Sequence, residues 1–271
     1  MIRVSAAMLA GFMLGAGAAE AAGFANHLAV YDIRLQHADD QTGISDVSGR
    51  MVVELTGSEC AGWSVGFRMV NRFVTSDGDP ARMIDVQSTS WESADGREMH
   101  YSERELVNND LKSDFDLKAS QPAPGKPVQV VAGPEADTAE LPAEVVFPMA
   151  HQRRLIEAAM AGKRRDRSLV YDGSEGAKFY TVITFIGLEE KGEALPGKSG
   201  GRFAGLRSWP MVISYFDDTD PKEGEAVPSH QIIMRMYENG VSGNLALDYG
   251  ELRLTGELRE LELKEAPPGC P

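Results

Sequence analysis

The sequence predicts a mostly β protein in which a large antiparallel sheet is interrupted by one helix. Apolar and polar residues alternate with a period of two through most of the chain, turn residues recur at short intervals, and a single segment has the apolar spacing of a helix. About a dozen strands with such spacing are typical of a barrel, a sandwich or a related antiparallel fold.

The strands follow from the alternation of apolar residues. In residues 27–36, the side chains of Ala29, Tyr31, Ile33 and Leu35 share one face. The other strand-like runs are residues 50–57, 63–74, 83–93, 97–106, 114–120, 128–132, 168–173, 178–190, 209–218, 230–238, 243–250 and 251–264.

Three local features refine this sheet. The turn residues Asp95-Gly96 predict a type I′ hairpin between two strands. Residues 178–188 are apolar on both faces, with Phe179, Ile183 and Phe185 on one of them, so we expect this part of the sheet to be covered on both sides. In the last strand the apolar positions change parity, which predicts a β-bulge near Arg259-Glu260.

One helix is predicted over residues 148–162, and it divides the chain into two β halves. Pro148 suits the first helical turn, and Gly162 followed by basic residues suits the end. The apolar stripe of this helix consists of Leu155, Ile156, Ala159 and Met160. The loops 120–127 and 195–203 are too short to be domain linkers, so we expect one continuous domain over residues 22–271.

The N-terminus predicts export. Arg3, a short apolar run rich in alanine and glycine, and Ala19-Glu20-Ala21 are typical of a signal peptide, here residues 1–21, removed to leave a periplasmic protein. An uncleaved anchoring helix is the alternative, although the run is shorter than the roughly 20 strongly apolar residues of a membrane span. No second apolar span follows, so an integral membrane protein is not expected.

Charge narrows the class of partner. The formal net charge of −14 disfavours nucleic acid and anionic membrane surfaces as partners. Against this background, the basic run Lys163, Arg164, Arg165 and Arg167 either complements the end of the helix or binds a phosphate or an acidic partner. We expect a monomer.

The sequence contains no recognisable catalytic or metal-binding constellation. Gly197–Gly201 matches G-x-S-x-G around Ser199, but its flanks predict a glycine-rich loop rather than the strand and helix of a nucleophile elbow. The five histidines lack metal-ligand spacing. His151, on the predicted helix, is expected to be a partly exposed polar residue. We therefore predict no catalytic residue, no metal and no cofactor.

The two cysteines, Cys60 and Cys270, are separated by most of the chain. They are either two unrelated thiols or one long-range disulfide. Export favours the disulfide, since oxidising compartments let such bonds persist and an even count pairs without remainder. Cys60 also lacks the second cysteine of a C-x-x-C redox motif.

Several blocks together resemble the EipB family of exported envelope-integrity proteins of alphaproteobacteria. The blocks are residues 60–63 (CAGW), 147–159 (FPMAHQRRLIEAA), 171–187 (YDGSEGAKFYTVITFIG), 208–216 (SWPMVISYF) and 237–250 (YENGVSGNLALDYG), followed by the lone Cys270. The resemblance implies a disulfide-bonded periplasmic protein whose sheet of about fourteen strands winds as a β-spiral, or open barrel, around a helix. It also implies a role in envelope integrity and carries over no catalytic residue.

Two functions therefore remain open. The first is a non-enzymatic envelope factor that binds a partner protein, a peptide or a lipid; the alternative is an envelope hydrolase with an unrecognised site. The chain has 12 Met and 10 Phe, among them Phe179, Phe185 and Met211, that suit an apolar groove between the helix and the C-terminal strands, unless these residues simply pack and leave no space. The candidate contacts for a ligand or partner are His151, Arg153, Arg154, Arg165, Met234 and Met236.

The disulfide gives a direct prediction. Non-reducing mass spectrometry of exported protein should find a mass two hydrogens below that of the dithiol. Cys270→Ser should unfold at a lower temperature, because the bond closes a loop whose entropy is worth up to roughly 5 kcal/mol. Two free thiols in periplasmic material would contradict the pairing.

Overall fold

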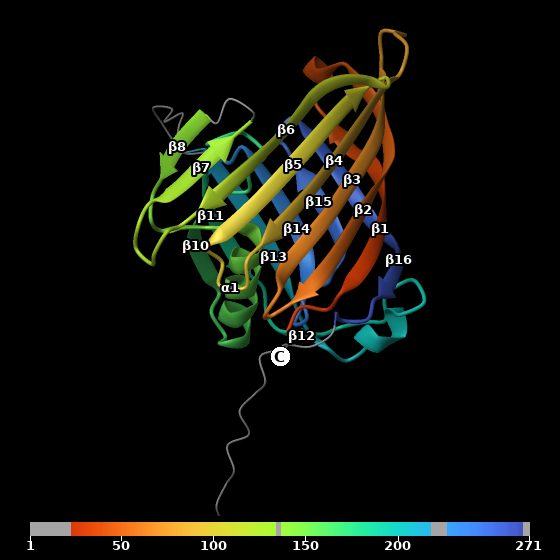
Figure 1. Cartoon of the computed structure of the whole chain (residues 1–271). Coiled ribbons are helices and arrows are strands. Elements are labelled where there is room, and N and C mark those ends of the chain that lie inside the picture. The colour runs from red at the N-terminus through yellow and green to blue at the C-terminus, as the bar shows by residue number, and fades with distance from the viewer. Residues whose placement is uncertain (1–22, 134–136, 218–226, 268–271) are drawn as a thin grey trace, which may run out of the picture.

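The computed structural model describes residues 23–133, 137–217 and 227–267. As predicted, most of these residues form one large sheet with one α-helix (Figure 1). The strands of the N-terminal half are β1 (His27–Ala38), β2 (Ile44–Ser58), β3 (Gly62–Thr75), β4 (Arg82–Glu92), β5 (Glu98–Val107), β6 (Asp110–Ser120), β7 (Val128–Ala132), β8 (Asp137–Leu141) and β9 (Val145–Val146).

The helix α1 (Pro148–Met160) follows β9 and leads into the C-terminal half. The remaining strands are β10 (Arg165–Val170), β11 (Tyr180–Ile186), β12 (Glu190–Lys191), β13 (Arg207–Asp217), β14 (His230–Tyr237), β15 (Ser242–Asp248) and β16 (Leu252–Leu263). Two short 3₁₀ helices, η1 (Asp40–Thr42) and η2 (Gly200–Phe203), lie in loops. Of the sixteen strands described, fourteen have five residues or more, which agrees with the expected number.

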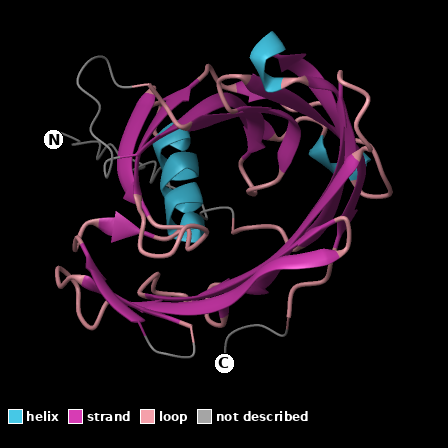
Figure 2. Ribbon diagram, turned by 90° about the horizontal axis from the view of Figure 1, so that it is seen from above, coloured by secondary structure: helices cyan, strands magenta, loops and turns pink. Residues whose placement is uncertain are grey.

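The sheet is a single path with the two ends of the described chain at its middle. From β1, consecutive strands pair outward to β8, and from β16 they pair outward to β9, with β12 beside β13. The first and last strands, β1 and β16, join the halves along almost their whole length. Neighbouring strands are antiparallel apart from β9 and β10, which are joined through α1. Viewed from above, the sheet curves around an interior in which α1 lies against one wall (Figure 2).

The predicted bulge is confirmed. Val30 pairs with Glu260 and Tyr31 pairs with Leu258, so Arg259 is the extra residue in β16. The bulge shifts the parity of the strand by one. For this reason Leu258 and Leu261 are both buried although one number is even and the other odd.

The predicted type I′ hairpin at Asp95-Gly96 is wrong in type. A type I′ turn needs positive φ at both central residues, whereas only Gly96 has it, at 66°. The Gly96 N–H donates to the Ser93 carbonyl over 2.9 Å, so the turn runs from Ser93 to Gly96. Asp95 keeps an ordinary φ because its carboxylate accepts hydrogen bonds from the Ser93 hydroxyl and the Arg97 N–H.

The expected cover on both faces of β11 is also incomplete. Tyr180, Val182 and Ile186 face the interior and are buried. Phe185 has the opposite parity and is 56% exposed, with the Arg165 guanidinium 5.9 Å from its ring centroid. Phe185 therefore belongs to the outer surface and cannot contribute to an internal groove.

The helix begins at the predicted residue and ends two residues early, at Met160. Its predicted stripe is confirmed: Leu155, Ile156 and Ala159 are buried, and they pack with residues of β11, β13 and β14 in one core cluster. Gly162 follows the helix at φ 74°, its N–H donates to Ala159, and the Lys163 N–H donates to Ala158. This is the Schellman arrangement that glycine permits at a helix C-terminus.

The start of α1 is capped from another strand. Phe147, at the N-cap position, offers no side-chain acceptor, and Pro148 has no N–H. The Glu92 carboxylate, at the end of β4, accepts the Met149 N–H over 2.8 Å and the Ala150 N–H over 3.4 Å. Glu92 is 1% exposed, so this contact joins the helix to the N-terminal half of the sheet in a desolvated place. Desolvation raises the pKa of Glu92 to about 7, against the lowering effect of the two N–H donors.

This capping predicts a pH-dependent stability. The raised pKa means that the folded state favours the protonated Glu92 carboxyl. The stability that this protonated carboxyl contributes is therefore complete below about pH 4.5 and is lost as the pH rises to about 7. Glu92→Gln keeps an acceptor for the helix and removes the charge. The free energy of unfolding of Glu92→Gln minus that of the wild type should therefore rise between pH 4.5 and 7, by up to roughly 3 kcal/mol, and stay level above.

Denaturant titrations at several pH values measure this difference, and comparing the two proteins cancels the contributions of the buried histidines. Glu98→Gln, an exposed change of the same charge on β5, is the matched control and should show no such rise. A difference for Glu92→Gln that is independent of pH would contradict the assignment.

Candidate ligand-binding cavity

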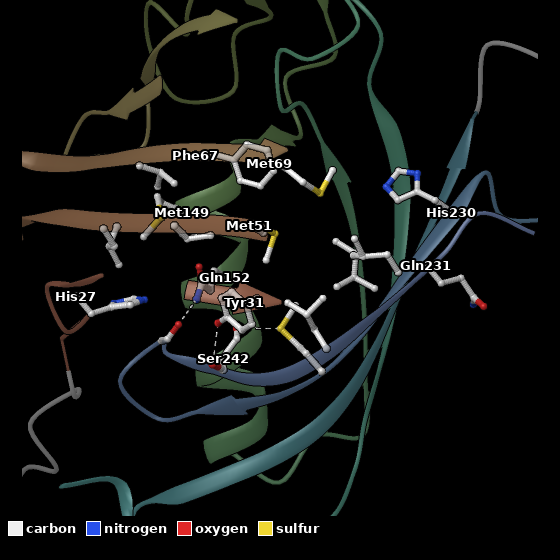
Figure 3. Close-up of a pocket in the computed structure, with 18 of the residues that line it drawn as sticks. His27, Tyr31, Met51, Phe67, Met69, Met149, Gln152, His230, Gln231 and Ser242 are labelled. Carbon is white, nitrogen blue, oxygen red and sulfur yellow. Dashed lines mark hydrogen bonds between the residues drawn. The ribbon is translucent and has the colours of Figure 1, made fainter. Parts of the chain in front are cut away.

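The interior of the sheet contains an apolar cavity of about 370 Å³ (Figure 3). Strands of both halves of the chain line it: β1, β2 and β3 on one side, and β14 and β15 on the other, with α1 at one end. The apolar side chains of the lining are Met51, Val53, Leu55, Val65, Phe67, Met69, Met149, Ile232, Met234, Leu245 and Leu247. No lysine, arginine, aspartate or glutamate is among the lining residues.

The cavity has a buried end and an open end. At the helix, it is lined by Tyr31, which is 3% exposed, and by the buried His27 and Met149. Figure 3 shows His230 on the opposite side from His27. Tyr249, another lining residue, is 46% exposed, which places the mouth of the cavity near β14 and the β15–β16 turn.

The polar groups at the helix end of the cavity form hydrogen bonds within the cavity wall. The Tyr31 hydroxyl donates to the Ser242 carbonyl over 2.9 Å, and the Gln152 amide donates to the Gly240 carbonyl over 2.7 Å. The Ser242 hydroxyl points at the Met234 sulfur, 3.1 Å away. Because these groups are already satisfied, they offer a guest little beyond apolar contact.

His27 is held neutral at this end. Burial lowers its pKa, although a hydrogen bond from Nδ1 to the Ala25 carbonyl, 2.7 Å, works the other way. A neutral ring adds no charge to the cavity wall. The buried end therefore suits the tail of an apolar guest rather than an ionic head group.

The structure separates the ligand contacts expected from sequence. Met234 lines the cavity, and Met236 is buried behind it against Gln152. His151 does not line it: this side chain is buried rather than partly exposed, its Nε2 has no hydrogen-bond partner, and desolvation lowers its pKa to about 4.

The three arginines point elsewhere. Arg153 pairs with Glu59 over 2.8 Å, and Arg154 pairs with Asp166 over 2.8 Å. Both border a separate polar hollow beside Glu92, and neither is among the residues that line the cavity. Arg165 stacks on the outer residue Phe185. These three candidate ligand contacts are therefore not among the residues that line the cavity.

Sequence reasoning missed the contribution of the N-terminal strands to this cavity. His27, Tyr31 and Phe67 were assigned to strands, but nothing local showed that β1–β3 would face β14 and β15. The alternation did place Tyr31 on the inward face of its strand. Only the pairing of β1 with β16 brings that face to Ser242.

The remaining predicted positions have structural contacts. The Ser199 hydroxyl accepts the Leu263 N–H over 2.9 Å, so it fastens a loop to β16. No group of three or more His, Cys, Asp or Glu suited to a metal occurs among the described residues. Within the same residues, no helix is long and apolar enough to cross a membrane. Cys270 and the predicted signal peptide, residues 1–21, lie outside the described residues, so the disulfide to Cys60 and the signal peptide both stay predictions.

The fold and the cavity together define a barrel-like β protein with an internal apolar cavity. Residues 18–265 match the family described as EipB-like, and the chain belongs to this family. A curated relative, the cell envelope integrity protein EipB of Brucella abortus (strain 2308), is 35% identical over 261 residues, which cover 94% of this chain and 90% of the relative.

A solved structure has the same fold. It is the crystal structure of a beta-barrel-like protein of a domain of unknown function from Brucella abortus, with a TM-score of 0.82 and 31% sequence identity. The match covers 90% of this chain and 100% of the other. The predicted fold class and the family resemblance are both confirmed.

Proposed function

We propose that this chain supports the integrity of the cell envelope from the periplasm by holding one acyl chain, of a lipid or an acylated molecule, in its internal cavity without altering it chemically. The envelope role is supported by the name of the Brucella relative, which is 35% identical. The periplasmic location is supported by the export signal read from residues 1–21.

The observation that supports an acyl chain as the ligand is the cavity itself. Its volume of about 370 Å³ lies in the range of small-ligand pockets. A methylene group needs about as much space as a water molecule, roughly 30 Å³, so the cavity has room for about a dozen of them. Four methionines line it, and methionine adapts to flexible apolar guests.

A folded peptide or a protein domain fits this space less well. The cavity is too small for more than one or two large side chains, and its buried polar groups are already bonded within the wall. An extended peptide would bring backbone N–H and C=O groups that find no free partner at the buried end, at a cost of several kcal/mol each. An alkyl chain carries no such cost.

Filling the cavity tests the proposal. Met234→Trp should weaken displacement of an uncharged apolar dye by dodecanol at least about tenfold, since the indole occupies the space of the guest. It should also fail to restore envelope-stress survival in a strain that lacks its own copy. Ile233→Trp is the matched control, because the neighbouring residue on β14 faces outward and is 37% exposed.

Thermal melting separates a filled cavity from an unfolded protein. If Met234→Trp does not fold, Met69→Trp fills the same cavity from β3. Unchanged dye binding and survival with a folded, filled variant would refute the proposal.

One contact favours the alternative of an envelope hydrolase. The Ser229 hydroxyl lies 3.2 Å from Nδ1 of His230, near the mouth of the cavity. A catalytic serine needs a base that is itself oriented by a third group. Here the Ser229 hydroxyl also donates to the Tyr215 carbonyl over 3.1 Å, and no described carboxylate hydrogen-bonds the other ring nitrogen of His230.

Ser229→Ala is therefore expected to leave envelope-stress survival unchanged, as is Ser199→Ala. Survival assays of complemented strains, with protein levels checked by immunoblot, measure this. Complete loss with Ser229→Ala in a protein that still folds, together with survival for Ser199→Ala, would identify a hydrolase and overturn the binding role.

A further inference from the structure

The mouth of the cavity is built from stacked rings. His230 stacks on Tyr215 with centroids 4.3 Å apart and planes inclined by 14°. Tyr180 meets both of these rings edge-on at 5.8 Å, and Tyr249 lies 6.1 Å from His230. We call these four residues the aromatic mouth. Two of them, His230 and Tyr249, line the cavity itself.

The aromatic mouth already holds one ammonium group. The Lys178 ammonium lies 5.0 Å from the centroid of the Tyr180 ring. It pairs with Glu175 over 2.7 Å and with Asp217 over 2.9 Å. Ring faces and carboxylates are the two kinds of group that attract an ammonium ion. The chain's own lysine thus shows which charge this end of the cavity stabilises.

A third carboxylate at the mouth has no cation of its own. Asp172 accepts hydrogen bonds from the N–H and hydroxyl of Ser174, and no described lysine or arginine pairs with it. The charge of Asp172 acts on two rings of the aromatic mouth. Burial raises the pKa of Tyr215, and Asp172 raises it further. Burial lowers the pKa of His230, and Asp172 works against this lowering. Lys178 therefore pairs with Glu175 and Asp217, whereas Asp172 has no described ion-pair partner.

The cavity lining itself supplies no cation for an anionic head group. The arginines that could attract an anion are on other surfaces: Arg153 and Arg154 beside Glu59 and Asp166, and Arg165 over Phe185. A carboxylate or phosphate head group at the mouth would find no unpaired cation among the described residues, because Lys178 pairs with Glu175 and Asp217, and Arg253, at the start of β16, pairs with Asp248.

We propose that the cavity selects an amphiphile with a cationic, ammonium-bearing head group, which lies against the aromatic mouth and Asp172 while its alkyl chain fills the apolar space behind. This inference rests on the proposed function and adds the chemical class of the head group. The proposed contacts of this head group are therefore not the arginines that the sequence offered as candidate ligand contacts.

Three probes that share an alkyl chain of the same length test the contribution of the head group separately from that of the alkyl chain. Dodecyltrimethylammonium, dodecanol and dodecanoate, each below its micelle concentration, are titrated against purified full-length protein loaded with an uncharged apolar dye. The ammonium probe should displace the dye with a dissociation constant about tenfold below that of the carboxylate, as expected for one cation–π contact with a nearby charge. Dodecanol should fall between them.

Two variants locate the selectivity. Asp172→Asn keeps the acceptor for Ser174 and should reduce the ratio between the ammonium and carboxylate probes to about threefold or less, with dodecanol unchanged. Tyr249→Leu, at an exposed rim position, should reduce it as well. Asp114→Asn makes the same charge change on the outer face, where Asp114 pairs with Arg104, and should leave the ratio as in the wild type.

The outcomes separate the two proposals. Displacement by all three probes with equal constants, tightest binding of the carboxylate, or an unchanged ratio in folded Asp172→Asn would overturn the head-group inference and leave the acyl-chain function standing. If no probe displaces the dye and the dye itself does not bind, both fail.

Discussion

The ladder between β1 and β16 holds the two halves of the sheet together. These strands lie more than 200 residues apart in sequence, yet they pair from His27 with Leu263 to Ala38 with Leu252. Their ladder turns two separate meanders into one curved sheet. It also brings Tyr31 to the Ser242 carbonyl, a bond that closes the wall of the cavity. Ordering so long a loop costs entropy that grows only slowly with length, so a long strand pair can offset it.

The helix supplies the second constraint. A curved sheet of this width encloses more space than its own side chains fill, and α1 occupies part of it with Leu155, Ile156 and Ala159. Glu92 caps the helix from β4 and so couples its position to the N-terminal half. What the helix does not fill, beyond Met149 and Gln152, is the cavity. Fold and binding site are thus two consequences of one packing arrangement.

The interior changes character along its length. Near the helix, polar groups are few and are bonded within the wall, as for Gln152 with Gly240. Towards the start of β14, the rings of His230 and Tyr249 replace aliphatic side chains in the lining, and Asp172, outside the lining, has no described ion-pair partner. An amphiphile has the same two parts in the same order. The change from apolar to polar surroundings along the cavity thus matches the change from alkyl chain to head group along an amphiphile. This match connects the proposed function with the proposed head group.

The strands, the helix and the bulge at Arg259 could be predicted from the sequence, because each depends on residues close together in the chain. Period-two alternation, the Leu155–Ile156–Ala159 stripe and the Gly162 stop act locally. The local pattern did not predict the type of turn at Gly96, because the hydrogen bonds of Ser93 and Asp95 favour another type. It also did not predict the exposure of Phe185, because that exposure depends on what covers the outer face of the sheet. Only the tertiary structure decided the site: it put the N-terminal strands opposite β14, turned Arg153 and Arg154 towards carboxylates away from the cavity, and gathered Tyr180, Tyr215, His230 and Tyr249 around its mouth. Such contacts join residues distant in sequence, and the direction in which a sheet curls is set by the whole of it rather than by any one strand.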